Sequence, residues 1–577
     1  MRVHHVRVCN FRGIKTLDWH PRHGLNCLIG PGDSCKTTVL DAISVTLAHR
    51  WNLTFSDADF YSGDPGNAIQ IDITLTGLDP ASLAKETFGE CLRGLGPDGT
   101  LHDEPVAGTN PAITIRLTVD ASLEPAWWLV RGPTYEPRRI SALQRQHLLV
   151  HRIDETATEH LTWSRSSALA RGTAPSPELP GLLASSQRAA RKAIFDHPSD
   201  ALQQAAAAAS VAASTTAATV IGDPRPGLDP AVQLRSGSLV LHDGELPIAT
   251  RGLGSRRLTS LAVQRWATSG TGVLLLDEVE AGLEPHRVRH LIRGLRTAQG
   301  EAMQVFCTTH SPTVIEEAAV AELCVVRTVD GSCAITSISE GELPPDDAGQ
   351  ALARSSPSAF LSRRIAVMEG KTEVGIARAL MEHFDLDAPA SSAAVRGVVT
   401  VDGAGATVAP VRAVGLAHLG YDVALIVDND GNTSEAELNG ATDAGCTVIQ
   451  VGQGHDIEAE VAASLPIPGL QEVVDLAVAL SDSDDPPESI RAMVQARLPD
   501  DTIELAGLDI TGWITVAGEP AVRLAVGRAA SAKKWFKTIS KGEQLGKILV
   551  SRMDEMAGTP LGQWIDALRA FTHPIAP

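Results

Sequence analysis

Residues 29–38 read IGPGDSCKTT, which nearly matches the GxxxxGK[ST] pattern of a phosphate-binding loop. In this pattern Gly30 opens the loop, Lys36 brings positive charge to the phosphates, and Thr37 holds Mg²⁺ through its hydroxyl. Cys35 occupies the place of the second glycine. If that position requires a left-handed backbone, a cysteine strains the loop by about 1–2 kcal/mol; if it requires only a small side chain, cysteine is tolerated. The stretch predicts a nucleotide site, with an ordinary strand-to-helix turn as the alternative.

Before the loop, apolar residues recur at every second position, as in a strand; after it, they recur at the 3.6-residue spacing of a helix. This change predicts a strand–loop–helix unit. The predicted strands are HHVRVCNF, GLNCLIG and AIQIDITLTGL, and the predicted helix is KTTVLDAISVTLAHRW. Farther along, GVLLLDE and QVFCTTH are apolar runs typical of buried parallel strands. The alanine-rich stretch at 201–220 predicts a helix because alanine has the highest helix propensity.

The composition is that of a globular chain without a membrane segment. The 577 residues are 44% hydrophobic and 20% charged, enough for several domains with sizeable cores. No run of about 18 apolar residues occurs, and the N-terminal stretch lacks the apolar core of a signal peptide. We therefore expect a cytoplasmic protein with no membrane partner. The eight cysteines show no zinc-type spacing, and the net charge of −20 argues only weakly against contact with nucleic acid.

Three downstream motifs offer the partners that a nucleotide loop needs. The strand VLLLDE ends in Asp277, suited to a metal-bound water, and Glu278, suited to activating the attacking water. The strand FCTTHS carries His310, which fits a γ-phosphate sensor. The turn RGLGSRR leads into a helix and can present backbone amides and Ser255 to a phosphate. Taken singly, each motif has a structural alternative: a strand end that meets a helix cap, a structural histidine, or an ordinary turn.

The order of these motifs resembles that of ABC-type ATPases, and the opening NFRGIKTLDW…GLNCLIGPGDSCKTTVLDAI resembles the split heads of the RecF, SMC and Rad50 group. The resemblance implies ATP as ligand and a homodimer of two heads, in which the signature turn of one subunit completes the site of the other. It also implies that Arg12 approaches the nucleotide, that Gln70 contacts the metal, and that EAGLEPHR forms the D-loop. The implied nucleotide-binding residues are Gly30, Gly32, Ser34, Cys35, Lys36, Thr37, Thr38, Gln70, Ser255, Asp277, Glu278 and His310, with Thr37 and Asp277 on the metal.

A second set of carboxylates follows three later apolar strands. In the stretch IAVMEGKTEV, a predicted strand ends at Glu369, and the predicted helix that follows contains Glu373. VALIVDNDGN ends a strand with Asp428 and Asp430, and alternate residues of an extended segment face the same side. VGQGHDIEAEV then adds Asp456, Glu458 and Glu460. Such oxygen ligands suit Mg²⁺ or Mn²⁺, and two ions could stabilise the attacking and leaving oxygens of a phosphodiester. The alternative is a helix start and a turn without catalytic role.

The glutamate and the DxD pair resemble the Toprim domain of topoisomerases, primases and certain nucleases. An ABC-type head followed by Toprim resembles the OLD family of ATP-dependent nucleases, which includes the nuclease subunit of the Gabija anti-phage system. The resemblance implies that Glu369, Asp428, Asp430, Lys541 and Glu278 are catalytic, with Lys537 and Lys547 as the other candidates for the lysine. The implied metal ligands of the second site are Glu369, Glu373, Asp428 and Asp430, with Asp456 and Glu458 as additional candidates.

The predicted fold is therefore α/β: an ABC-type head with an insertion, a Toprim domain and a helical C-terminal region. The predicted domain boundaries are 1–79 and 241–345 for the two parts of the head, 80–240 for a mostly helical dimerisation region, 362–470 for Toprim and 471–577 for the helical region that completes the nuclease.

These predictions point to a metal-dependent endonuclease on double-stranded DNA, regulated by nucleotide at the head and employed in anti-phage defence. A homodimer or higher homo-oligomer is expected, and a helicase-type protein partner stays open. The first alternative is an ATP-driven DNA repair clamp of the RecF type with a non-catalytic Toprim domain. The second is a primase or topoisomerase, which the three tyrosines, Tyr61, Tyr135 and Tyr421, do not favour because none has a catalytic context.

Overall fold

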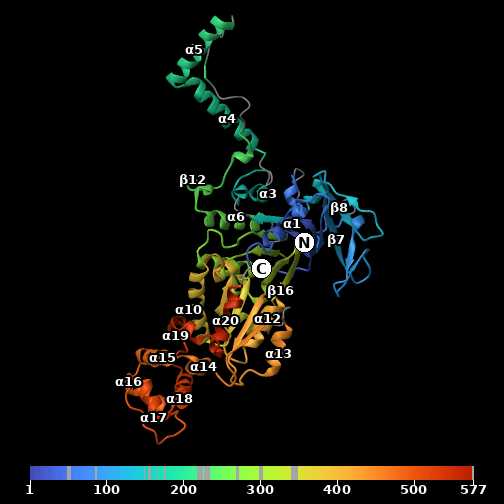
Figure 1. The fold of residues 1–577 in the computed structure, drawn as a ribbon. Coiled ribbons are helices and arrows are strands. Elements are labelled where there is room, and N and C mark those ends of the chain that lie inside the picture. Colours follow the sequence, from blue (N-terminus) through green and yellow to red (C-terminus); the bar gives the residue numbers. More distant parts are fainter. Residues whose placement is uncertain are drawn as a thin grey trace.

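The computed structural model shows a head, a second α/β domain beneath it, and a helical C-terminal region, of which residues 467–532 lie at the far end and residues 539–572 beside the second domain (Figure 1). The residues that the structure describes are 1–48, 53–84, 87–148, 150–153, 157–164, 167–173, 177–217, 225–226, 234–267, 272–297, 303–338 and 348–574. The predicted α/β class is confirmed. None of the helices in this described part of the chain combines the length and apolar character that a membrane crossing requires.

The head is built on one large sheet that changes from parallel to antiparallel pairing. Its spatial order is β10 (Val150–Ile153), β13 (Gly272–Leu276), β14 (Met303–Thr308), β3 (Leu25–Ile29), β15 (Leu323–Val329), β16 (Ser332–Ser337), β2 (Ile14–Trp19), β1 (Arg2–Phe11), β4 (Ile69–Thr76), β7 (Asn110–Val119), β5 (Arg93–Leu95) and β6 (Leu101–His102), with β8 (Pro125–Val130) on β7 and β9 (Arg138–Arg139) on β8. The strands from β10 to β15 in this order are parallel, so their carboxyl ends meet along one edge.

The parallel strands are continuous apolar runs because both of their faces are covered. Every residue of β3, β13 and β14 is buried. Helix α1 (Lys36–Leu47) starts directly after the loop that follows β3 and packs its apolar residues against the isoleucines of β4. The predicted strands and helices of this unit are confirmed; the last residues of two predicted helices, 49–51 and 218–220, lie outside the described residues.

The prediction of a mostly helical region at 80–240 is wrong for its first half. Up to β10, the described residues form β5 to β9 and one short helix, α2 (Ala142–Arg145), and the five strands extend the sheet of the head. In β7 the residues Ile113, Ile115 and Leu117 are buried at every second position, which is a strand pattern. The remaining α-helices of this region come afterwards: the short α3 (Ala168–Gly172) and the long α4 (Leu179–Asp196) and α5 (Asp200–Ala217). Figure 1 shows α4 and α5 projecting away from the head.

The remaining elements of the head follow the insertion. They are the hairpin β11 (His242–Asp243) and β12 (Leu246–Pro247), then α6 (Leu253–Ala267), α7 (Pro285–Thr297), α8 (Pro312–Glu317) and α9 (Ala348–Ser355).

The second domain contains a four-stranded parallel sheet in the order β18 (Val398–Asp402), β17 (Arg364–Met368), β19 (Asp422–Val427) and β20 (Thr447–Gln450). The helices of this domain are α10 (Lys371–Asp387), α11 (Ala393–Arg396), α12 (Ala409–His418), α13 (Glu435–Asp443) and α14 (Ile457–Ser464). The predicted apolar strands before EGKTE and before DNDGN are thus confirmed as β17 and β19, and they are neighbours in the sheet.

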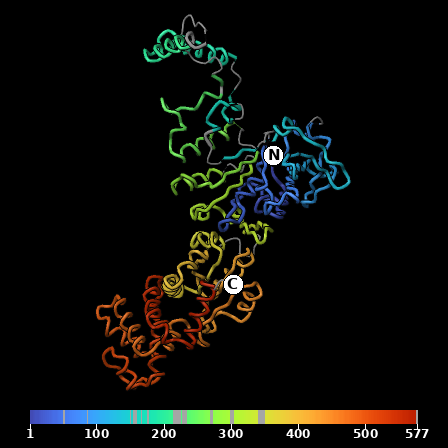
Figure 2. Tube along the Cα trace, turned by 45° about the horizontal axis from the view of Figure 1, so that its top comes forward, coloured from blue at the N-terminus to red at the C-terminus, as the bar shows by residue number. Residues whose placement is uncertain are grey.

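The C-terminal region is helical, as predicted, and it packs against the second domain (Figure 2). Its helices are α15 (Ile467–Ala479), α16 (Pro486–Gln495), α17 (Ile510–Ala517), α18 (Glu519–Ala532), α19 (Ile539–Ser551) and α20 (Pro560–Thr572). Glycines allow α10 and α19 to approach closely: a Cβ added at Gly375 would lie 2.3 Å from the carbonyl oxygen of Ile539, and one at Gly542 would lie 2.6 Å from that of Thr372. This crossing fixes the segment before α19 beside the carboxyl end of β17.

The head and the second domain share one apolar core. Side chains of β14 and β15 belong to the same cluster as those of β17, β19 and α12. At the junction the hydroxyl of Tyr421 donates to the carbonyl of Phe360 at 2.8 Å, and the guanidinium of Arg327 lies 4.0 Å from the centre of the Tyr421 ring. Tyr421 is therefore a buried structural residue, and burial raises the pKa of its hydroxyl far above the ordinary value. It offers no nucleophile for strand passage.

We predict that Gly542→Ala lowers the free energy of unfolding by about 1–3 kcal/mol, because the new methyl group meets backbone at the crossing of α10 and α19. Gly440→Ala is the matched control: Gly440 lies exposed in α13 with open space around its Cβ position, so alanine there should be neutral or stabilising by up to about 1 kcal/mol. Thermal and urea denaturation followed by circular dichroism measure both. Equal effects of the two substitutions would contradict the close crossing.

Candidate nucleotide and carboxylate sites

The phosphate loop joins β3 to α1, and Cys35 lies at its last position with φ 68° and ψ 18°. This is the left-handed region, where a side chain is strained and glycine is not. The two alternatives for Cys35 are thus decided: the position is one that favours glycine. Gly30 also has a positive φ of 138°, and a Cβ there would lie 2.6 Å from the carbonyl oxygen of Val326.

Lys36 folds back onto the loop. Its ammonium group donates to the carbonyl of Pro31 at 2.7 Å, to that of Gly30 at 3.1 Å and to the hydroxyl of Ser34 at 3.3 Å. Burial lowers the pKa of Lys36 to about 8. The ammonium group therefore occupies the concave side of the loop without a carboxylate within salt-bridge distance among the described residues, an environment that an anion would improve.

The start of α1 offers backbone N–H donors, with Asp277 as the acidic group that accepts a hydrogen bond from its first turn. No side chain caps its first turn, and no acidic residue lies in that turn. The unpaired N–H groups and the helix dipole favour negative charge at this point. Gly32 is exposed and open, and Thr38 lies half-buried in the first turn. The loop amides and Lys36 thus fit the phosphates of a nucleotide.

The predicted metal-binding pair of the head is brought together. The hydroxyl of Thr37 donates to Asp277 at 3.0 Å, although 240 positions separate them, and Thr308 donates to the same carboxylate oxygen at 2.6 Å. Glu278 is exposed, has a left-handed φ of 46°, and its backbone N–H donates to Thr308 at 2.8 Å. A strained backbone at a predicted water-activating residue is typical of functional sites.

His310 lies at the end of β14, on the exposed edge where Asp277 also lies. Its backbone N–H donates to Glu280 at 2.7 Å, and Thr309 donates to the other oxygen of Glu280 at 2.8 Å. The sequence did not predict the roles of Thr308, which hydrogen-bonds Asp277 and Glu278, and of Glu280, which hydrogen-bonds Thr309 and His310. Both stand within the quoted motifs, but the motif patterns assign them no role.

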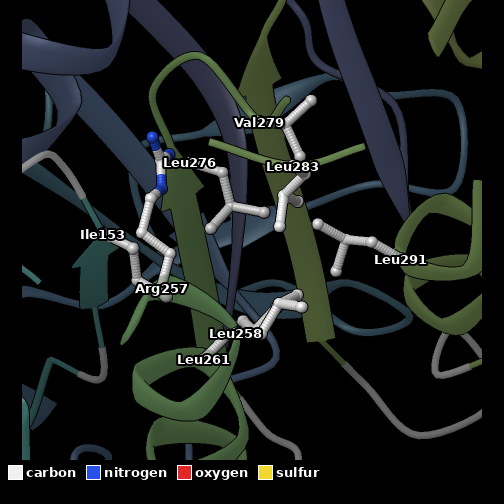
Figure 3. Close-up of a pocket in the computed structure, with 8 residues that line it drawn as sticks. All are labelled: Ile153, Arg257, Leu258, Leu261, Leu276, Val279, Leu283 and Leu291. Atoms are coloured by element: carbon white, nitrogen blue, oxygen red, sulfur yellow. The ribbon is translucent and has the colours of Figure 1, made fainter. Parts of the chain in front are cut away.

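The turn RGLGSRR (251–257), which the resemblance identifies as the signature turn, leads into α6 and packs against the segment EAGLEPHR (280–287) of the same chain. A Cβ at Gly254 would lie 2.1 Å from the carbonyl oxygen of Gly282, and Ser255 is in the first turn of α6. Figure 3 shows leucines of α6 against Leu276 and Leu283, with Arg257 beside β13; Arg257 donates to the carbonyl of Asp277 at 2.5 Å. The turn is thus fixed relative to Asp277, and no contact of Ser255 with the phosphate loop of its own chain is found among the described residues.

Two residues assigned to the nucleotide by resemblance have other partners. The side-chain amide of Gln70 donates to Asp72 at 3.2 Å, on the face of the sheet opposite the isoleucines that meet α1, so the structure does not bring it to Thr37. Arg12 pairs with Asp41 and with Asp59. Arg152, which the sequence reasoning did not single out, pairs with Asp41 as well and lies 3.6 Å from Asp277.

At the second site, the carboxylates predicted from three separate motifs converge at the carboxyl ends of β17 and β19. Glu369 accepts the backbone N–H of Asp428 at 2.9 Å, and Asp428 accepts that of Ile457 at 2.9 Å. Glu373 accepts the N–H of Gly370 at 3.1 Å, and Glu458 accepts the hydroxyl of Thr372 at 3.1 Å. Backbone and hydroxyl donors thus hold four acidic side chains in place.

These four side chains gather acidic groups at one largely buried place. Glu373, Asp428 and Glu458 are each at most 5% exposed, and Glu369 is half-buried. Burial raises the pKa of all four carboxyl groups, and the neighbouring carboxylates raise those of Glu373 and Asp428 further. Carboxylate oxygens are the ligand type that hard divalent cations such as Mg²⁺ or Mn²⁺ prefer; in this structure no three of these side chains bring their oxygens within 4.8 Å of one another.

Lys537 is the ammonium group that faces these carboxylates. Its Nζ lies 3.3 Å from Glu458. Burial alone would lower the pKa of Lys537, but Glu458, Glu373 and Asp428 together raise it above the ordinary value. Lys541, the preferred candidate from the sequence, instead donates to the carbonyl of Leu480 at 3.3 Å. The structure thus places Lys537, and not Lys541, beside the carboxylates, because Lys537 lies in the turn before α19 that the helix crossing directs toward Glu458.

The two remaining acidic candidates lie at the rim. Asp430 is exposed and accepts the backbone N–H of Asn432 at 3.0 Å. Asp456 caps α14 by accepting the N–H of Ala459 at 2.8 Å. Both are close enough to Glu369 to raise its pKa, so they remain candidates for an ion at the open side of the cluster.

Comparison with known proteins supports an ATPase-type domain in the head. A family model described as "AAA domain, putative AbiEii toxin, Type IV TA system" matches residues 149–316, which contain the signature turn, Asp277 and His310. This span is less than half of the chain. No curated protein matches the chain.

Solved structures of ATPase heads resemble part of the chain. An SMC head bound to the C-winged helix domain of ScpA shares 14% identity with a TM-score of 0.35 and covers 58% of this chain and 97% of its own. The SMC head domain from Thermotoga maritima shares 13% at a TM-score of 0.28, covering 58% and 99%. RecF with ATP in the RecFOR pathway shares 13% at a TM-score of 0.33, covering 58% and 97%. At these levels the likenesses identify neither a family nor an activity for this chain.

We predict that Cys35→Gly stabilises the protein by about 1 kcal/mol because it removes the side chain from a left-handed position. Cys35→Ala is the control, since alanine also lacks the thiol but keeps the Cβ that causes the strain. Denaturation curves should place alanine near the natural protein and glycine above both. If both variants shift stability equally, the thiol and not the backbone is responsible.

We also predict that ATP binding takes up protons at alkaline pH. In the free loop the pKa of Lys36 is about 8, so at about pH 9 most molecules carry a neutral amine, whereas bound phosphates favour the ammonium form and raise this pKa. Calorimetric titration at about pH 9 in two buffers of different ionisation enthalpy should show uptake of up to one proton. The same titration at about pH 7.5 is the control and should show much less uptake, because Lys36 is already protonated there. Equal uptake at the two pH values would contradict the shifted lysine.

Proposed function

We propose that this chain is a nucleotide-binding, metal-dependent endonuclease that cleaves double-stranded DNA at the carboxylate cluster. The observation that carries the proposal is the meeting of Glu369, Glu373, Asp428 and Glu458 around Lys537 at the carboxyl ends of two neighbouring parallel strands. Open α/β sheets bind ligands at this edge. A cluster with several buried carboxylates and one lysine suits a negatively charged substrate only when cations are bound.

The divalent ions would be held by Glu369, Glu373, Asp428 and Glu458, with Asp430 and Asp456 at the rim. When bound, they would supply positive charge against the attacking and leaving oxygens of the phosphodiester. The protein itself contributes orientation: backbone N–H groups hold Glu369 and Asp428, so their carboxylates are preorganised. Lys537 contributes a fixed positive charge that faces the negative charge developing on the phosphate.

The head would act as a nucleotide sensor. The loop amides, Lys36, Thr37 and Asp277 fit ATP and a magnesium ion, because the buried ammonium group and the free start of α1 both favour an anion. Glu278 and His310 would meet the terminal phosphate. Whether hydrolysis is fast depends on the loop, and the strained Cys35 favours slow turnover.

Strand β15 provides a contiguous set of contacts between the two sites. Thr328 donates to the carbonyl of Ser34 in the phosphate loop at 3.1 Å, and the neighbouring Arg327 stacks on Tyr421. Tyr421 directly precedes β19, the strand that ends at Asp428. A change of the loop on nucleotide binding therefore has a physical route to the carboxylates.

Further parts of the proposal concern partners. Two chains would form a homodimer in which Ser255 of one head completes the nucleotide site of the other, and larger assemblies are compatible with this arrangement. The resemblance to the OLD family further implies a role in defence against phage and a helicase-type protein partner, and we include both in the proposal.

We predict that the purified protein nicks supercoiled plasmid when Mg²⁺ or Mn²⁺ is added, and that Asp428→Asn abolishes this activity. Lys537→Ala should lower the rate by about 100-fold or more because it removes the charge that faces the phosphate. Lys541→Ala is the matched control and should retain most of the activity, since Lys541 contacts the carbonyl of Leu480 instead.

Gel assays with and without ATP measure these rates. Absence of nicking by the natural protein under every condition would favour the alternative of an ATP-driven repair clamp of the RecF type. Loss of activity in Lys541→Ala with retention in Lys537→Ala would overturn the assignment of the lysine.

A further inference from the structure

A group of three histidines and one aspartate gathers on the antiparallel part of the head sheet. His5 of β1, Asp18 of β2, and His20 directly after β2 lie on the face opposite α1, because the alternate residues Val6 and Trp19 belong to the core that contains α1. The rings of His5 and His20 stack with centres 4.3 Å apart, and His5 Nε2 lies 2.8 Å from Asp18 Oδ1.

An irregularity of β1 adds a third ring. The register with β4 pairs Val3 with Leu75 and His5 with Thr74, so His4 is an extra residue on β1. A bulge of this kind re-aims a side chain that strict alternation would send to the other face. The ring of His4 accordingly lies edge-on to that of His20, with centres 5.4 Å apart. His4, His5, Asp18 and His20 are called the histidine cluster below.

We propose that the histidine cluster binds a divalent transition-metal ion of the Zn²⁺ class. Within the described ranges, His5, Asp18 and His20 are the one set of three or more His, Cys, Asp or Glu side chains whose ligand atoms all lie within 4.8 Å of one another. Zinc bonds of about 2.0–2.2 Å place neighbouring ligand atoms about 3.3 Å apart, so small side-chain rotations suffice. Two imidazoles and a carboxylate, with His4 available as a fourth ligand, select Zn²⁺, Co²⁺ or Ni²⁺ over Mg²⁺.

The proposed ion would be accessible from one side. His4, His5 and His20 line a cavity of about 650 Å³ whose wall also contains Arg7, Arg93 and others. A zinc ion with three or four protein ligands at such a wall resembles an open site more than a closed structural one. The wall also contains Asp72, and the ion pairs of Arg116 with Asp72 and of Arg93 with Asp103 balance part of its positive charge. This site is separate from both the phosphate loop and the carboxylate cluster, whose acidic groups are more widely spaced.

The test uses the full chain without a histidine tag, because such a tag binds the same metals. The protein is treated with a chelator, supplied with excess Mg²⁺ to fill oxygen-ligand sites, and titrated with Co²⁺ while visible absorption is recorded. We expect one equivalent of Co²⁺ with the absorption of a site containing nitrogen ligands. His5→Ala and His20→Ala should each lose that equivalent, whereas His242→Ala, an exposed histidine on β11, should keep it.

Asp18→Asn keeps the size of the side chain and should weaken Co²⁺ or Zn²⁺ binding by about 10-fold or more. Circular dichroism checks that each variant is folded, and Zn²⁺ should raise the melting temperature of the natural protein more than that of the cluster variants. Unchanged stoichiometry in both His5→Ala and His20→Ala, or the lack of any Co²⁺ equivalent in the natural protein, would overturn the proposal. Neither result bears on plasmid nicking, so this site and the endonuclease are tested independently.

Discussion

Four carboxyl groups that share one ammonium group constrain the whole second half of the chain. Neighbouring carboxylates repel one another, and burial disfavours the ionised form of each carboxyl group. Hydrogen-bond donors and positive charge must therefore stabilise the ionised carboxylates. The fold supplies both through backbone N–H donors to Glu369, Glu373 and Asp428 and through Lys537. The helical C-terminal region follows from this constraint: the glycine-lined crossing of α10 and α19 is what brings Lys537 to Glu458.

The head buries a basic group where the second domain buries acidic ones. Its loop holds the ammonium group of Lys36, and the first turn of α1 contains no acidic residue, while Asp277 from β13 accepts a hydrogen bond from Thr37. Both sites lie at the carboxyl ends of parallel strands. In the proposed function, an anion at the first site and cations at the second would complete these groups.

Apolar strands that end in acidic residues were predictable from the sequence, because burial on both faces removes polar residues from the strand and leaves them at its end. Asp277, Glu369 and Asp428 were found in this way. The choice between Lys537 and Lys541 was not predictable, since both lie in one basic segment and only the helix crossing distinguishes them.

Other errors have similar physical causes. Apart from β7, the strands between 87 and 153 have six residues or fewer, so a two-residue alternation of apolar residues is visible only in β7. Gln70 stands on a correctly predicted strand, but which face it occupies depends on the packing of α1. The histidine cluster could not be predicted, because its residues do not follow the spacing of a known metal-binding motif. His4 joins the cluster only because of the bulge in β1, which the sequence does not reveal.

The position of Cys35 bears on what nucleotide does in this protein. A left-handed cysteine makes the empty loop less stable than a glycine loop would be, and the same loop contacts Thr328 of β15 through Ser34. In the proposed function, phosphates would draw Lys36 away from the carbonyls of Gly30 and Pro31, and contacts with the ligand would replace its three hydrogen bonds to the loop. Ser34 of this loop accepts from Thr328, the residue that follows Arg327, and Arg327 stacks on Tyr421. A strained loop coupled to the second domain in this way suits a nucleotide that reports its presence better than one consumed rapidly as fuel.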